Sequence, residues 1–215
     1  MMTRKQTRAK QEIGFLYING LGDGTTTLKD KIVHWWWKRK SLDIHYAHIN
    51  WYDGKSFEDK LQAVHQMVNT MLHDFGGVAI IGSSAGGSLA LNAFSQLKTK
   101  NVCAVIAHGR LRAGNYNNRN SMHHRAHLDT PRPSRSFYDS VMYAEKEVIP
   151  SLSDDEKMRL LVLSQLTDLV VPLECMGIEG VEEHHSLVFG HSGGFVAHFL
   201  SDRDIISTFA QSQLP

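Results

Sequence analysis

Short apolar runs alternate with longer segments of helical periodicity along most of the chain. Strands are predicted at Gly14–Ile18, Ile44–Trp51, Val78–Ile81, Val102–Ala107, Leu160–Leu163 and Ser186–Phe189. Helices are predicted at Thr27–Lys38, at Phe57–Phe75, from Gly87 to about Leu97 and at Gly193–Phe209. Several of the strands are apolar on both faces, as buried parallel strands are. This alternation predicts the α/β class, with a mostly parallel sheet of about six strands and helices on both faces.

One long stretch, from Arg110 to about Pro150, interrupts the alternation. It is rich in Arg, Asn, His and Ser, and it is too long for an ordinary connection between two elements. Its later part, Phe137–Ile149, is predicted to be helical. We therefore expect a flexible basic tail at residues 1–12, followed by a single domain at residues 13–215 with a cap-like insertion at about residues 110–150.

Composition and charge indicate one cytoplasmic globular domain. The 215 residues are 42% hydrophobic and 21% charged, and the formal net charge is +1. So small a net charge gives no general attraction to nucleic acid or to a membrane, and no apolar run reaches the ~20 residues of a spanning helix. The basic N-terminus lacks the apolar segment of a signal peptide. Cys103 and Cys175 match neither a disulfide framework nor a zinc spacing, and Cys103 is expected to be a buried apolar residue.

The pentapeptide Gly82–Gly86 carries the strongest chemical signal in the chain. It reads G-S-S-A-G, with Ser84 at its centre, and it lies between an apolar strand and a run of small residues typical of a helix. In a strand–turn–helix of the G-x-S-x-G type, the central serine has a strained backbone, and its neighbours two positions away must be small. Ser84 is therefore the predicted nucleophile of a hydrolase. The alternative is a glycine-rich turn that only allows close packing.

A serine nucleophile needs a base to take its proton and an acid to orient that base. Asp168 comes shortly after the predicted strand Leu160–Leu163, and His191 comes shortly after the predicted strand Ser186–Phe189. Because the carboxyl ends of parallel strands meet at one edge of a sheet, we expect both residues to lie near Ser84. The sequence thus predicts a triad of serine, histidine and aspartate.

The chain order Ser84, Asp168, His191 resembles that of the α/β-hydrolases. The resemblance covers about residues 14 to 210 and implies a nucleophile turn after the central strand of a mostly parallel sheet. The chain begins too close to its first strand to hold the two extra N-terminal strands of larger members. The resemblance therefore implies a minimal form, similar in size to cutinases and small bacterial lipases.

The resemblance also implies an oxyanion hole, in which backbone N–H groups stabilise the negative charge that builds on a carbonyl oxygen. The two donors implied are Leu21, in the loop after the first strand, and Ala85, directly after the nucleophile. Asn19 stands where the family often has His.

The implied function is a serine hydrolase that cleaves carboxylic esters, or thioesters, of small to medium acyl substrates. His191 would deprotonate Ser84, Asp168 would orient the imidazole, and water would then hydrolyse the acyl-enzyme. This chemistry needs no metal and no organic cofactor. Acyltransferases, peptidases and carbon–carbon hydrolases use the same machinery, because the pocket decides the substrate. A hypothesis of another class is a catalytically silent interaction module, which a complete triad argues against.

Two residues of the predicted triad have alternatives. Asp168 could instead be the N-cap of a following helix, and His198 is a rival to His191 as the base.

Two other motifs suggest ligand sites but have simpler explanations. His123–His127 contains three histidines but has no carboxylate or cysteine partner at a matching spacing, so a solvated loop is favoured over a metal site. Gly20–Gly24 has the wrong spacing for a dinucleotide-binding loop.

The insertion and the tryptophan run are the candidate contact regions. Arg119, Arg125 and Arg132 are candidate substrate-binding residues, because a basic cap would attract an anionic substrate; the alternative is a solvated loop. Trp35–Trp37 cannot all face inward, because successive helical residues point about 100° apart. We expect this run on the side away from the active site, where it packs inward or forms a homo-oligomer surface.

Overall fold

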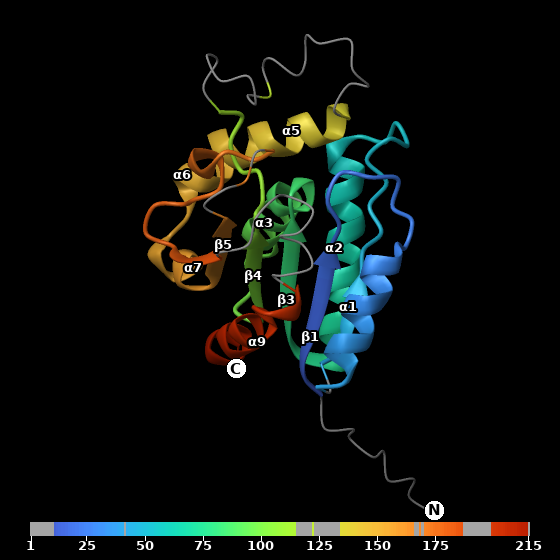
Figure 1. Cartoon of the computed structure of the whole chain (residues 1–215). Helices are drawn as coiled ribbons and strands as arrows, with labels where there is room; N and C mark the ends of the chain where they lie inside the picture. The colour runs from blue at the N-terminus through green and yellow to red at the C-terminus, as the bar shows by residue number, and fades with distance from the viewer. Residues whose placement is uncertain are drawn as a thin grey trace, which may run out of the picture.

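A six-stranded parallel sheet forms the centre of the molecule (Figure 1). The computed structural model describes residues 11–40, 42–114, 122, 134–165, 168, 170–186 and 199–214. The strands are β1 Gln11–Ile18, β2 Ile44–Tyr46, β3 Phe75–Ser83, β4 Val102–Ala107, β5 Leu160–Gln165 and β6 Glu182–Ser186. Their order across the sheet is β2-β1-β3-β4-β5-β6, and every neighbouring pair is parallel. The predicted fold class is confirmed.

This strand order has one reversal of direction, between β1 and β3. From β1 the chain first moves outward to β2, then returns to β3 and continues outward on the other side as far as β6. In open α/β sheets, ligands bind at such a reversal, in the crevice beyond the carboxyl ends of the strands. The loops after β1 and β3 are therefore the expected place for a functional site.

Helices cover both faces of the sheet. The main ones are α1 Leu28–Lys38, α2 Phe57–Asp74, α3 Ala85–Leu97, α5 Arg135–Tyr143 and α9 Arg203–Gln213. Along β1, Phe15 and Tyr17 pack in a core with residues of α1 and α9, whereas Leu16 and Ile18 pack in a second core with residues of α2, α3 and α5. Successive strand residues point to opposite faces, so one apolar run supplies both cores. Within the described residues, no helix is long and apolar enough to cross a membrane.

The later part of the predicted insertion is a continuous helical run. It consists of α5, the π-helical turn η1 Ala144–Val148 and α6 Ile149–Ser151, so helix over Phe137–Ile149 is confirmed. Figure 1 shows α5 lying above the carboxyl ends of the strands. Buried polar contacts fix it to α3: the Ser88 and Ser140 hydroxyls are 2.9 Å apart, and Asn92 Nδ2 donates to the Ser140 carbonyl at 2.9 Å.

Several element boundaries differ from the prediction. Strand β3 begins at Phe75 rather than at the predicted Val78, so Gly76 and Gly77 belong to the strand, and β2 ends at Tyr46 rather than at the predicted Trp51. A Cβ at Gly77 would lie 3.0 Å from Leu214 Cδ1, so a glycine lets the C-terminal segment pack on the strand. Strand β6 is Glu182–Ser186, so of the predicted strand Ser186–Phe189 only Ser186 is described, and α9 ends at Gln213, beyond the predicted Phe209. The start of the predicted helix Gly193–Phe209 is likewise not described. Residues 187–198 lie outside the described part of the chain.

Glu156, in the short helix α7 Asp154–Met158, couples the start of β5 to the end of α3. Its carboxylate accepts hydrogen bonds from Lys98 Nζ at 2.8 Å and from the Ser153 backbone N–H at 3.0 Å. Burial alone would raise the pKa of Glu156, but the hydrogen bonds from Lys98 and Ser153 outweigh it and lower the pKa from 4.5 to about 2. A carboxyl group with a lowered folded-state pKa stabilises the fold above its unfolded-state pKa, and this contribution is lost as the pH falls through the folded-state value.

We therefore expect Glu156→Gln to lower the free energy of unfolding at neutral pH by about 1–2 kcal/mol, a figure reduced for the solvent exposure of Lys98. The difference from wild type should shrink as the pH falls from 4.5 toward 2, the window set by the two pKa values. Urea unfolding over that range measures it, with the exposed Glu147→Gln as the matched control. A difference that stays constant with pH would disprove the role of the charge.

Candidate active site

The turn between β3 and α3 holds Ser84 in a backbone conformation that side chains rarely adopt. Its φ is 51° and its ψ is −115°. Such a residue costs about 1–3 kcal/mol and persists only when its surroundings enforce it. Here the Ser84 backbone N–H donates to the Ala107 carbonyl at 3.2 Å, and the Ser84 carbonyl accepts from the Gly87 and Arg110 backbone N–H groups at 3.1 Å each.

Glycines on either side of Ser84 let the strand, the helix and the neighbouring loop come together. A Cβ at Gly82 would lie 2.3 Å from the Gly86 carbonyl oxygen, and one at Gly86 would lie 2.4 Å from the Ile18 carbonyl oxygen. Both distances are far below van der Waals contact, and both involve backbone that has no freedom to move aside. The two glycines of the motif are therefore required by packing, as the sequence predicts.

The loop after β1 lies directly against Ser84. A Cβ at Gly20 would be 3.2 Å from Ser84 Cβ and 3.7 Å from Ser84 Oγ. The Asn19 side chain holds this loop: Nδ2 donates to the Ile49 carbonyl at 2.9 Å, and Oδ1 accepts from the Ile49 backbone N–H at 2.6 Å. Asn19, which departs from the usual family residue, thus ties the loop after β1 to the loop after β2.

The two residues expected to donate to an oxyanion, Leu21 and Ala85, directly follow the two residues of this contact. Ala85 is the first residue of α3, and the first N–H groups of a helix have no partner within the helix. Leu21 follows Gly20 in the loop after β1. Both residues line the same cavity as Ser84, and the N-terminus of a helix favours negative charge.

That cavity has a volume of about 360 Å³ and lies at the reversal in strand order. Its apolar wall includes Leu21, Phe137, Val170 and Val171. Its charged lining consists of Asp23, Lys29, Asp30 and Arg110. Pockets for small ligands are mostly apolar with a few polar groups, and they start at about 300 Å³. The cavity therefore fits a small molecule beside Ser84.

Asp168 lies beyond the carboxyl end of β5, in a segment that reaches the cavity through Val170 and Val171. Its Oδ1 accepts hydrogen bonds from the Val170 and Val171 backbone N–H groups at 2.7 and 3.0 Å. The next helix, the 3₁₀ turn η2 Leu173–Cys175, has Pro172 at its N-cap position. Asp168 therefore stabilises a turn before the helix, and the alternative role as a helix N-cap is not observed.

Arg110 connects the Asp168 segment to the nucleophile turn. The side chain is buried, with 3% of its surface exposed. Its Nη2 donates to the Val170 carbonyl at 2.8 Å and its Nη1 to the Ala113 carbonyl at 3.3 Å, while its backbone N–H donates to Ser84. In the sequence Arg110 is only the first residue of the long basic insertion, so this structural role was missed.

Tyr17 lines the cavity and contacts Ser83, the residue next to Ser84. Its hydroxyl and the Ser83 hydroxyl are 2.9 Å apart, and both groups are buried. Burial raises the pKa of Tyr17 well above its usual range, so its phenol stays protonated at any ordinary pH. The Ser83 hydroxyl is therefore hydrogen-bonded to Tyr17 within the wall of the cavity.

Comparison with solved structures identifies the architecture. One of LipS and LipT, metagenome-derived lipolytic enzymes, aligns with a TM-score of 0.62 at 14% identity, over 94% of this chain and 95% of that one. A hydrolase assigned to the α/β superfamily from Xanthomonas campestris aligns with a TM-score of 0.53 at 12% identity, over 94% and 98%. The chain has the α/β-hydrolase fold. A bromoperoxidase from Bacillus anthracis aligns with a TM-score of 0.61 at 11% identity, over 93% of each chain.

These likenesses establish the fold of this α/β-hydrolase-fold protein, not its reaction. No family model and no curated protein matches the sequence. The structural neighbours are described by different activities, lipolysis and bromoperoxidation among them. Function must therefore be argued from the site itself.

Several of the predicted residues lie outside the described part of this α/β-hydrolase-fold chain. They are the base His191, its rival His198, the candidate substrate-binding residues Arg119, Arg125 and Arg132, and the histidines of His123–His127. The structure therefore brings together Ser84, Leu21 and Ala85 around one cavity, with Asp168 on a segment that lines it. Among the described residues, no three His, Cys, Asp or Glu side chains gather as they would around a metal ion.

Proposed function

We propose that this protein is a serine hydrolase that cleaves carboxylic esters of small to medium acyl substrates. The observation that carries the proposal is the strained backbone of Ser84, at a cavity beyond the central strands of the sheet. A strained residue at such a position is typical of a functional group held for chemistry. Serine in that conformation, flanked by the N–H of a helix start, supports nucleophilic attack on a carbonyl.

The proposed reaction has two halves. Ser84 Oγ attacks the ester carbonyl while His191 takes the hydroxyl proton, and the Leu21 and Ala85 backbone N–H groups stabilise the resulting oxyanion. His191 then donates that proton to the leaving alcohol, which leaves an acyl group on Ser84. Water, deprotonated by His191, attacks the acyl-enzyme, and the acid product departs as Ser84 recovers its proton.

In this scheme Asp168 orients the imidazole of His191 and stabilises its positive charge. Two backbone N–H groups hold the Asp168 carboxylate through Oδ1, and the Arg110 contact to Val170 fixes the segment that carries it. A fixed acid supports catalysis because the imidazole must present one nitrogen to Ser84 throughout the reaction.

The cavity limits the substrate. A volume of about 360 Å³ is near the lower end of small-molecule pockets, which supports short or medium acyl groups over long lipid chains. The described charged lining has two carboxylates, Asp23 and Asp30, beside the cations Lys29 and Arg110. This balance gives no preference for an anionic substrate, so such a preference would depend on Arg119, Arg125 and Arg132.

The test is labelling with a fluorophosphonate probe, followed by peptide mapping of the adduct by mass spectrometry. We expect one adduct on wild type, on Ser84, and an unchanged adduct on the matched control Ser83→Ala. Labelling on another residue would disprove the nucleophile assignment. The absence of any adduct would reject the hydrolase and favour an interaction module that uses the same fold.

A further inference from the structure

The outer face of α1 exposes three large apolar side chains in a line. Leu28 is 73% exposed, Ile32 45% and Trp35 54%. Their spacing of four and three residues places them on the same side of a helix. Seven large apolar side chains are exposed among the described residues, and three of these belong to this helix of 11 residues. Single exposed apolar residues are common, but an aligned group indicates a contact surface.

The packing of α1 does not explain this line. The inner side of the helix is held by Val33 and Trp37, which are buried in the core between α1, α9 and the sheet. The Trp37 indole N–H also donates to the Phe199 carbonyl at 2.8 Å. Within the run Trp35–Trp37, Trp37 is thus part of the core and Trp35 is exposed, while Trp36 is partly buried beneath Arg203.

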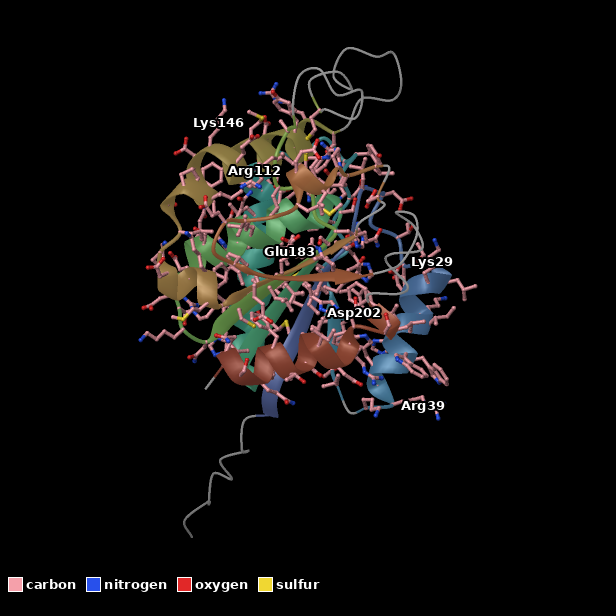
Figure 2. All side chains as sticks on the ribbon, turned by 60° about the vertical axis from the view of Figure 1, so that its left-hand side comes forward. Lys29, Arg39, Arg112, Lys146, Glu183 and Asp202 are labelled. Carbon is pink, nitrogen blue, oxygen red and sulfur yellow. The ribbon has the colours of Figure 1, made fainter. Side chains whose placement is uncertain are left out.

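Cations surround the apolar line. They are Lys29, Lys31, Lys38, Arg39 and Lys40, all exposed. Figure 2 shows Lys29 and Arg39 at the two ends of α1, at the edge of the molecule. The Arg39 guanidinium lies 4.8 Å from the centre of the Trp35 ring. The one acid of α1, Asp30, is buried and accepts hydrogen bonds from Thr27, so it offsets little of this charge at the surface.

We propose that this α1 face, formed by the apolar line and its surrounding cations, binds an anionic lipid surface. A bilayer interface accepts both kinds of group at once: apolar chains and Trp enter the headgroup boundary, while Lys and Arg attract anionic headgroups. Nucleic acid would use the cations but would leave Leu28 and Ile32 exposed. A second copy of the chain would bring two basic helices together, which like-charge repulsion opposes.

Charge complementarity is thus the argument for lipid rather than another protein. The net charge of the whole chain is only +1, so the cations of this face are a local concentration rather than a general property. Among the described residues from Leu28 to Tyr46, Asp43 is the one exposed acid, against the five exposed cations. The inference is independent of the reaction at Ser84, and it can be tested with Ser84→Ala protein.

The experiment is flotation with vesicles of phosphatidylcholine, with and without phosphatidylglycerol. We expect binding only to the anionic vesicles. The pair Lys31→Gln/Lys38→Gln should lower the vesicle partition coefficient about tenfold or more, because each surface cation contributes roughly a fivefold factor. The pair Ile32→Ser/Trp35→Ser should lower it by a similar factor. The matched control Lys55→Gln/Lys146→Gln removes the same charge elsewhere and should change it less than about twofold.

Four results would overturn the proposal. The first is no flotation of wild type with anionic vesicles. The second is an equal loss in the control pair, which would mean non-specific charge attraction. The third is a dimer in light scattering that Ile32→Ser/Trp35→Ser dissociates, which would assign the face to a second copy. The fourth is binding of duplex DNA that depends on Lys31 and Lys38 but not on Ile32 and Trp35.

Discussion

Replacing Ser84 by alanine is expected to lower kcat/KM for ester hydrolysis by about 10⁵-fold, equivalent to ~7 kcal/mol of transition-state stabilisation. The substitution removes only Oγ, and alanine has the same Cβ, so the backbone at φ 51° is neither relieved nor further strained. The fold should therefore remain, and the loss should appear in kcat. Assays with a panel of short-chain esters measure kcat, and far-ultraviolet circular dichroism checks that the fold is retained.

Two companion variants sharpen this prediction. Ser83→Ala should keep most of the activity, because Ser83 Oγ contacts Tyr17 in the wall of the site. Ser84→Gly should be as inactive as Ser84→Ala, yet its free energy of unfolding should rise by about 1 kcal/mol. Glycine adopts a positive φ without strain, and the free energy of the relieved strain exceeds the cost of the greater conformational entropy that glycine loses on folding. Activity retained in Ser84→Ala would show that another group is the nucleophile.

Most of the fold could be predicted from the sequence because it follows from local patterns. Apolar runs on both faces mark the buried strands, and helix starts such as Thr27 and Ser56 have capping boxes that the structure contains. The boundaries that were missed are set by contacts between distant segments. Residue His48 has a φ of 37°, and Trp51 donates to Gly22, so the segment after β2 bonds to the loop after β1 instead of extending the strand.

The candidate site also has parts that could be predicted from the sequence and parts that could not. The turn at Ser84 could be predicted because strand, glycines and helix are contiguous, and the structure places the expected donors Leu21 and Ala85 at the same cavity. The role of Arg110 could not be predicted, because its guanidinium donates a hydrogen bond to the Val170 carbonyl, 60 positions away in the sequence. In the sequence, Arg110 is one arginine of a basic stretch. No local pattern distinguishes it from its neighbours.

Replacing Asp168 by asparagine is expected to lower kcat/KM by about 10⁴-fold while leaving the fold intact. Asparagine keeps an oxygen that can accept from the Val170 and Val171 backbone N–H groups, so the turn after β5 should persist. It loses the negative charge, and its amide can favour the wrong imidazole tautomer. The base would then be misoriented, and its positive charge would no longer be stabilised.

The rate of fluorophosphonate labelling gives the decisive measurement for Asp168→Asn. It should fall with kcat/KM, because both reactions need a deprotonated Ser84, while the free energy of unfolding changes by less than ~1 kcal/mol. Asp155→Asn is the matched control: Asp155 is exposed in α7, which precedes β5 and so lies toward the other edge of the sheet. A loss below about tenfold in Asp168→Asn would mean that another acid orients the base. A large loss with unchanged stability would support Asp168 as the triad acid, since a purely structural turn residue would lower stability first.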